Sequence, residues 1–243
     1  MQLYFAPMEG VTPWHYRQTH AALFGGVDCY YTPFLNPTEA GLAGKALQEV
    51  LPEHNRGVNT VPQILTNNAE RFVLACQTLA ELGYTEVDLN LGCPSGTVVA
   101  KGRGAGFLAP SRREQLEAFL EEIFAKSPLR ISLKTRLGME SPGEFAELLA
   151  LYNRYPAAQL TIHARVREDY YKRPVRWDAF AILDAAAFVC ATIAIPFWLF
   201  PQDVWHFAII LLCFVSTVWG VQHFRFRPLF MLLNCLVAGA ILL

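Results

Sequence analysis

Charged side chains are distributed very unevenly along this chain of 243 residues. Residues 180–243 carry only four of them, Asp184, Asp203, Arg225 and Arg227. Residues 1–179 carry the other 18 Lys+Arg and 19 Asp+Glu, and their net charge is −1. Because about a quarter of the residues of a water-soluble domain are charged, the split indicates two parts. We expect a soluble domain over residues 1–180 and a membrane segment over residues 181–243.

Three apolar runs make up the predicted membrane segment, at residues 181–200, 204–221 and 228–243. The first two approach the ~20 residues that span a hydrocarbon core, and the third is shorter. A buried globular helix is the alternative for any one run, but three in succession favour two or three transmembrane helices in a lipid bilayer. Arg225 and Arg227 place the second connection on the cytoplasmic side. The soluble domain is therefore expected in the cytoplasm and residues 181–243 in the inner (cytoplasmic) membrane.

Composition excludes several classes of protein. A hydrophobic content of 53% excludes a disordered chain, and a net charge of −1 excludes polyanion binding by bulk positive charge. No signal-peptide pattern precedes the soluble domain, which predicts reduced thiols. The six cysteines show neither a CxxC pair nor a paired spacing with histidine, so we expect no disulfide framework and no metal site. They are Cys29, Cys76, Cys93, Cys190, Cys213 and Cys235.

Short apolar runs alternate with helical periodicity through the soluble domain. The apolar runs are residues 3–6, 28–32, 61–65, 86–91, 130–136 and 159–163. Helical spacing recurs at 69–82, at 111–124 behind an expected N-cap at Ser111, and at 142–153 behind Ser141 and Pro142. Repeated strand–helix units predict an α/β fold with a parallel sheet and right-handed crossovers.

Polar residues lie within or at the ends of four otherwise apolar strands: Gln63, Asn90, Lys134 and His163. An unpaired buried lysine is costly by several kcal/mol, so something must compensate the charge of Lys134. In a parallel (β/α) barrel the carboxyl ends of all strands point to one face, where the chemistry takes place. We therefore expect these four side chains to converge on one pocket.

Six sequence strings stand in a fixed order over residues 1–179: APMEGVT (6–12), VPQIL (61–65), DLNLGCPSGTV (88–98), GRGAGFL (102–108), LKTRLG (133–138) and IHARVREDYY (162–171). Together they resemble the tRNA-dihydrouridine synthases. The resemblance implies a flavin-dependent TIM barrel followed by a small helical RNA-binding domain. It also implies reduction of the C5=C6 bond of uridines in tRNA, with FMN as cofactor, NADPH as reductant and tRNA as partner.

Cys93 matches the family's general acid, which protonates uracil C5 while the flavin delivers hydride to C6. A thiol suits this task because its unperturbed pKa is about 8.5, so that it is protonated yet able to donate at neutral pH. An inert buried cysteine is the alternative.

The resemblance also assigns cofactor contacts. Lys134 would face the N1/O2 edge of the flavin and stabilise its reduced anionic form. Gln63 would hydrogen-bond the ring, and His163 would lie near it. The first-strand segment Pro7, Met8 and Glu9 would contact the flavin through its backbone. The alternatives are a snorkelling lysine, a strand-edge glutamine and a structural histidine.

Substrate contacts follow in the same way. Asn90 matches the residue that binds the substrate nucleotide. Arg165 and Arg167 belong to a basic stretch suited to RNA phosphates, and Lys101 and Arg103 beside the glycines of GRGAGFL are further candidates. A solvated loop of mixed charge is the alternative for the basic stretch.

The family pattern is not found beyond residue 180, where two further strands and an RNA-binding domain would follow. Six strands cannot close an eight-stranded barrel. We therefore expect an incomplete TIM (β/α) barrel of about six βα units, truncated and joined to an unrelated membrane segment.

Three functions remain open. The first is an FMN-dependent tRNA-dihydrouridine synthase. The second is a catalytically inactive membrane-anchored fusion or binding protein. The third is a membrane protein whose function lies in residues 181–243.

Overall fold

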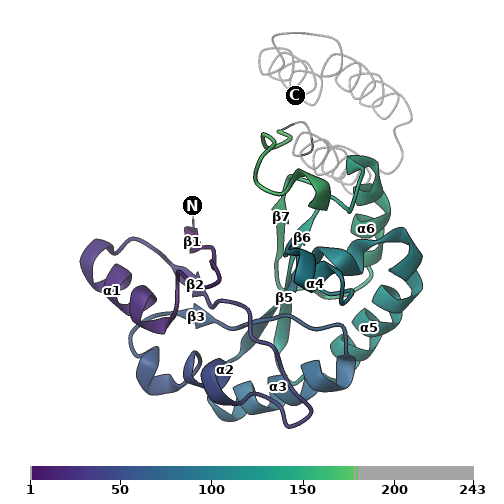
Figure 1. The fold of residues 1–243 in the computed structure, drawn as a ribbon. Helices are drawn as coiled ribbons and strands as arrows, with labels where there is room; N and C mark the ends of the chain where they lie inside the picture. Colours follow the sequence, from purple (N-terminus) through teal and green to yellow (C-terminus); the bar gives the residue numbers. More distant parts are fainter. Residues whose placement is uncertain (1, 178, 180–243) are drawn as a thin grey trace, which may run out of the picture. The chain divides into compact units, whose positions relative to one another are not determined.

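A computed structural model describes residues 2–177 and 179 of the chain (Figure 1). The chain divides into two units, Met1–Val175 and Arg176–Leu243. The predicted membrane segment lies outside the described residues, as do its three expected helices. Within the described residues, no helix is both long enough and apolar enough to cross a bilayer.

Parallel strands form the centre of the first unit. They are β1 (Tyr4–Phe5), β2 (Cys29–Tyr31), β3 (Thr60–Val61), β4 (Gln63–Ile64), β5 (Glu86–Leu91), β6 (Arg130–Arg136) and β7 (Leu160–His163). They pair in the orders β1-β2-β3 and β4-β5-β6-β7, every pair parallel. Pro62, which has no N–H to donate, separates β3 from β4 within the third apolar run. The α/β class and the parallel sheet are confirmed.

Helices connect the strands, and Figure 1 shows α3, α5 and α6 along the outer side of the sheet. The α-helices are α1 (Trp14–Phe24), α2 (Gly44–Gln48), α3 (Ala69–Glu81), α4 (Gly96–Val99), α5 (Arg113–Lys126) and α6 (Phe145–Tyr152). Five short 3₁₀ helices accompany them in the described residues: η1 (Pro52–His54), η2 (Gly104–Leu108), η3 (Pro110–Arg112), η4 (Pro142–Glu144) and η5 (Arg167–Asp169).

The expected N-cap at Ser111 is wrong. Ser111 lies inside η3, and α5 starts after it at Arg113 with no side-chain cap. Pro110 explains the difference, because its fixed φ starts a 3₁₀ turn one residue earlier and gives Ser111 a helical backbone. At the other predicted start, Ser141 forms a capping box with Glu144.

The strands β5 and β6 separate an apolar face from a polar face. Val87, Leu89 and Leu91 of β5 are fully buried, as expected for the face that packs on helices. Phe119 of α5 bridges the helical layer, with ring centroids 6.0 Å from Phe72 of α3 and 5.3 Å from Phe107 of η2. The alternate residues of β5 and β6 are polar, and they build the candidate site.

Candidate active site

Register places the four predicted polar residues on neighbouring strands of one face. Gln63 of β4 pairs with Asp88 of β5, Asn90 of β5 pairs with Lys134 of β6, and Arg136 of β6 pairs with His163 of β7. Residues two apart on a strand share a face, so these side chains form a polar ladder across β4–β7. The structure thus places Gln63, Asn90, Lys134 and His163 on one face of β4–β7, with Gln63 at the first residue of β4 and the other three in the carboxyl halves of their strands.

Asn90 holds the turn that carries Cys93. Its Oδ1 accepts hydrogen bonds from the backbone N–H of Gly92 at 3.0 Å and of Cys93 at 2.9 Å. Cys93 is a half-buried free thiol directly after β5. The carbonyl of Cys93 accepts from the N–H of Ala105 at 3.0 Å, so η2 braces the turn from below.

Gly104 makes this close approach between η2 and the turn possible. Its φ is +54°, and a Cβ at this position would lie 2.9 Å from the Cys93 carbonyl oxygen. Only glycine fits both the backbone conformation and the space. The GRGAGFL string therefore has a structural task beside the Cys93 turn.

Gln63 is buried, with 1% of its surface exposed, and both ends of its amide are engaged. Its Nε2 donates to Asp88 Oδ2 at 2.7 Å, and its Oε1 accepts from Asn90 Nδ2 at 2.7 Å. Its backbone N–H donates to Thr32 Oγ1 at 3.0 Å. The amide plane of Gln63 is therefore fixed by the protein alone.

Asp88 is a site residue that sequence reasoning missed. It is 1% exposed and accepts from Ser132 Oγ at 2.9 Å as well as from Gln63. Burial raises the pKa of Asp88 to about 7, and the hydrogen bonds from Gln63 and Ser132 and the charge of Lys134 oppose the rise. Alternation with Asn90 on a buried strand was the signal that could have found it.

Lys134 is half-buried and projects from the same face. Within residues 2–177 and 179 its Nζ has no hydrogen-bond partner and no ion pair. Burial lowers the pKa of Lys134, Arg136 lowers it further, and the charge of Asp88 raises it. The compensation expected for this lysine thus comes from the fields of Asp88 and Cys93, and its ammonium hydrogens are free for a ligand.

His163 is half-buried at the end of β7 and accepts a 2.8 Å hydrogen bond at Nε2 from Arg165 Nη1. The proton of the neutral imidazole therefore resides on Nδ1. Burial lowers the pKa of His163 to about 4, with further contributions from Arg136, Lys134 and Arg165. The ring is neutral at physiological pH and presents an N–H donor.

Arg136 is a second residue that the sequence analysis did not assign. It is buried and donates from Nε to the Gly92 carbonyl at 2.7 Å, and from Nη1 to the carbonyls of Val166 and Tyr170 at 3.1 Å each. Its Cζ lies 5.4 Å from the ring centroid of Tyr171. Arg136 therefore ties the Cys93 turn to the segment after β7.

The other predicted site residues lie around this ladder in more open positions. Met8 and Glu9 are exposed after β1, where the Met8 N–H donates to Thr12 Oγ1 at 2.9 Å, and Pro7 is half-buried. Burial raises the pKa of Glu9, and the charge of Glu49 adds to the rise. No hydrogen bond or ion pair joins this segment to the ladder within the described residues.

The four predicted RNA-binding residues differ in their exposure and in the contacts that their side chains make within the protein. Lys101 is exposed, and Arg103 is half-buried with Nε 3.4 Å from Asn67 Oδ1. Arg165 donates from Nε to the Arg173 carbonyl at 2.7 Å. Arg167 pairs with Glu168 and has its Cζ 4.8 Å from the ring centroid of Tyr170.

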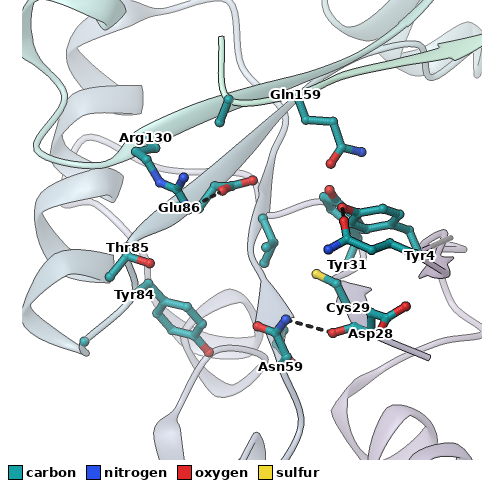
Figure 2. Close-up of a pocket in the computed structure, with 15 residues that line it drawn as sticks. Tyr4, Asp28, Cys29, Tyr31, Asn59, Tyr84, Thr85, Glu86, Arg130 and Gln159 are labelled. Atoms are coloured by element: carbon teal, nitrogen blue, oxygen red, sulfur yellow. Dashed lines mark hydrogen bonds and ion pairs between the residues drawn. The ribbon is translucent and has the colours of Figure 1, made fainter. Parts of the chain in front are cut away.

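A pocket of about 510 Å³ opens at the other end of the strands (Figure 2). Glu86 and Arg130, at the starts of β5 and β6, line it together with Asp28, Cys29 and Tyr31. None of the sequence-predicted site residues lines this pocket. Since ligands of parallel β/α folds bind at the carboxyl ends of the strands, the ladder is the better candidate. No cluster of three or more metal-ligating side chains occurs within the described residues.

Comparison with known proteins agrees with this geometry. The sequence model of the family described as dihydrouridine synthase (Dus) matches residues 4–194. This chain belongs to the dihydrouridine synthase family. The match runs fourteen residues past residue 180, where we expected the resemblance to end. Membership implies the TIM-barrel class for the parallel strands described above.

Curated relatives include several tRNA-dihydrouridine(16) synthases. That of Pseudomonas putida is 34% identical over 190 residues, which cover 73% of this chain and 57% of the relative. That of Ralstonia nicotianae is 31% identical over 193 residues, covering 76% and 58%. A probable tRNA-dihydrouridine synthase of Staphylococcus epidermidis is 30% identical over 176 residues, covering 71% and 52%. The chain thus spans little more than half the length of these relatives.

Proposed function

We propose that this chain is an FMN-dependent tRNA-dihydrouridine synthase that reduces the C5=C6 bond of a uridine in tRNA, with Cys93 as general acid. The observation that supports it best is the ladder at the carboxyl ends of β4–β7, in which Gln63 and Asn90 lead directly to the Cys93 turn. The relatives from Pseudomonas putida and Ralstonia nicotianae carry the name of this activity.

The side chains of the ladder fit a flavin. Lys134 offers an ammonium without a protein partner, suited to a ring edge that becomes negative on reduction. Gln63 has used one of its two amide hydrogens and one of its two oxygen lone pairs, so that one of each remains for the ring. His163 adds a neutral Nδ1–H donor. We assign Pro7, Met8 and Glu9 as further flavin contacts.

When bound and reduced by NADPH, FMN would supply the hydride for uracil C6. Cys93 then donates the thiol proton to C5, for which its half-buried place after β5 leaves it accessible. Asn90 has one Nδ2 hydrogen left after donating to Gln63, and we assign this hydrogen to the substrate base. We assign Lys101, Arg103, Arg165 and Arg167 to tRNA phosphates.

The test is direct. The full chain is purified in detergent and inspected for a flavin spectrum. It is also expressed in a synthase-null cell whose tRNA is digested and assayed for dihydrouridine by mass spectrometry. We expect near-stoichiometric bound FMN and restored dihydrouridine. A colourless preparation together with dihydrouridine-free tRNA would overturn the proposal.

One observation favours a second candidate, a catalytically inactive membrane-anchored fusion or binding protein. The chain carries three apolar runs within residues 181–243, which we expect to lie in a bilayer. This candidate predicts protein that sediments with membranes and is released only by detergent, without flavin. The active synthase with a bilayer-anchored end predicts the same sedimentation, but with flavin and with residues 1–180 accessible from the cytoplasm.

A further inference from the structure

We infer that Asp88 is a positioning residue, whose carboxylate orients the amides of Gln63 and Asn90 and through them the turn that carries Cys93. The inference deepens the proposed function and rests on it for its catalytic meaning. The geometry on which it is built lies entirely within residues 63–132.

The carboxylate of Asp88 restricts how the amide beside it can be oriented. An ionised carboxylate only accepts hydrogen bonds, whereas a carboxamide both donates and accepts. The Gln63 amide group that faces Asp88 Oδ2 at 2.7 Å must therefore be the NH₂. Its oxygen is then turned to Asn90, whose NH₂ must donate to it at 2.7 Å.

The orientation of the Gln63 amide in turn determines that of the Asn90 amide. With its NH₂ directed at Gln63, Asn90 presents Oδ1 to the backbone N–H groups of Gly92 and Cys93. The backbone N–H groups of Gly92 and Cys93 can only donate, so they require the same orientation of Asn90 as the carboxylate does. The negative charge at Asp88 fixes the opposite end of this path of four hydrogen bonds.

Burial makes the preference of the two amides for this orientation strong. Asp88 and Gln63 are each 1% exposed, so that water does not compete for their polar groups. Ser132 Oγ donates the remaining hydrogen bond to Asp88 Oδ1 at 2.9 Å. The alternative orientation of Gln63 would bring two oxygens together in a site without solvent, at the cost of an unmade buried hydrogen bond.

The charged and titratable groups around Asp88 come from three strands. Lys134 of β6 favours its ionised form, Glu86 of β5 opposes it, and Cys29 and Tyr31 of β2 lie within its field. The pKa of Asp88 stands at about 7. Protonation converts the carboxylate into a group that also donates, and the directional argument then no longer holds. The Cys93 turn should accordingly be held more tightly above pH 7 than below it.

The test reads the hydrogen bonds directly in the full chain without flavin. Hydrogen–deuterium exchange of the 86–98 peptide is followed from pH 5.5 to 8.5 and corrected for intrinsic rates, with the α5 peptide 113–126 as internal reference. In the wild type we expect protection of Gly92 and Cys93 to rise at least about fivefold across pH 7. Asp88→Asn should remove this rise and leave the α5 protection unchanged.

Thermal unfolding separates positioning from mere support. Asp88→Asn is nearly isosteric and removes a buried charge, so at pH 8 the melting temperature should be equal to or above that of the wild type. A support role instead predicts a lower melting temperature and lost protection in α5 as well. That result, or an unchanged exchange profile in Asp88→Asn, would overturn the inference.

Ser132→Ala provides a second variant that keeps the carboxylate. The hydrogen bond from Ser132 lowers the pKa of Asp88, so its loss should move the exchange inflection to higher pH. An unmoved inflection contradicts the inference even if Asp88→Asn fails to fold. Because exchange needs neither flavin nor tRNA, the inference and the proposed function can fail independently of each other.

Discussion

The two ends of β5 and β6 carry similar numbers of charged residues, but the ion pairing of these residues differs between the ends. At the amino end, Glu86 and Arg130 form an ion pair at 3.0 Å. At the carboxyl end, Lys134 and Arg136, together with Arg165 after β7, form no ion pair in the part of the chain that the structure describes. Charges that are paired within the protein, as at this balanced amino end, stabilise the fold. Unpaired charges, as at the unbalanced carboxyl end, indicate a ligand-binding site.

The comparison also shows that cavity volume alone is a poor guide to the site. The pocket of about 510 Å³ is at the balanced end, where Figure 2 shows Glu86 directed at Arg130. The unbalanced end has the half-buried thiol of Cys93, the unpartnered ammonium of Lys134 and the neutral imidazole of His163. The reactive side chains and the pocket therefore lie at opposite ends of the same strands. We expect substitutions at the two ends to have different effects.

The largest expected difference concerns one cysteine from each end. Cys93→Ala should lower dihydrouridine formation about 100-fold or more, because a general acid contributes about 10²- to 10⁴-fold. Flavin affinity should stay within about twofold, since the sulfur is not among the proposed flavin contacts. Cys29→Ala, a matched change in the pocket at the amino end, should keep the activity within about twofold. Single-turnover assays on tRNA from synthase-null cells measure both. Equal losses of activity in the two variants would contradict the assignment of the active site to the carboxyl end.

Next in size is the effect of two cations on the same face of β6. Lys134→Met should weaken FMN binding about tenfold or more, because a hydrogen bond to a charged group contributes about 1.5–3 kcal/mol. Arg130→Met removes a residue whose side chain is 70% exposed, and FMN affinity should then change less than about twofold. Quenching of FMN fluorescence by flavin-free protein measures both dissociation constants. Comparable weakening by Arg130→Met would contradict the assignment of the flavin to the carboxyl end.

A smaller effect is expected on the histidine at the unbalanced end. Arg165→Gln should raise the pKa of His163 from about 4 towards 6.5, because the charge of Arg165 disfavours the protonated ring. In the wild type the ring should stay neutral down to about pH 5. NMR titration of the imidazole signals, assigned with His163→Gln, gives the value. A pKa that stays at about 4 would show that burial and the charges of Arg136 and Lys134 set it without Arg165.

The smallest effect is expected where the charges are balanced. Glu86→Gln should change the free energy of unfolding by no more than about 1 kcal/mol, because its partner is largely exposed and such pairs contribute little. Activity should be unchanged. Urea unfolding of the variant measures the difference, and a loss of several kcal/mol would show that the amino end is more than a surface pair.

Local pattern was enough to predict the long elements. The runs 86–91 and 130–136 coincide with β5 and β6, and the stripe of 69–82 buries Phe72, Ala75 and Cys76 in α3. The short strands were less certain in their bounds, since β1 holds two residues and Pro62 divides the third run. At Ser111 the backbone preference of the preceding proline overrode the side chain.

The site was predictable in part, because strand ends can be recognised in sequence and the contacts between them cannot. Gln63, Asn90, Lys134 and His163 share one face of β4–β7, and their convergence on one pocket and their roles stay predictions. Asp88 and Arg136 were not predicted because their hydrogen-bond partners are 25 and 44 residues away in sequence. Nothing in a single strand shows which amide faces a carboxylate across the ladder.

Gly104 has a consequence for how this sequence can change over time. A methyl group there would press on the Cys93 carbonyl oxygen from 2.9 Å and tilt the peptide that presents the sulfur. In a saturation library, position 104 should therefore accept no substitution that preserves turnover, even in clones that still fold and accumulate normally. Evolutionary substitution of Gly104 is therefore limited by the main chain of Cys93.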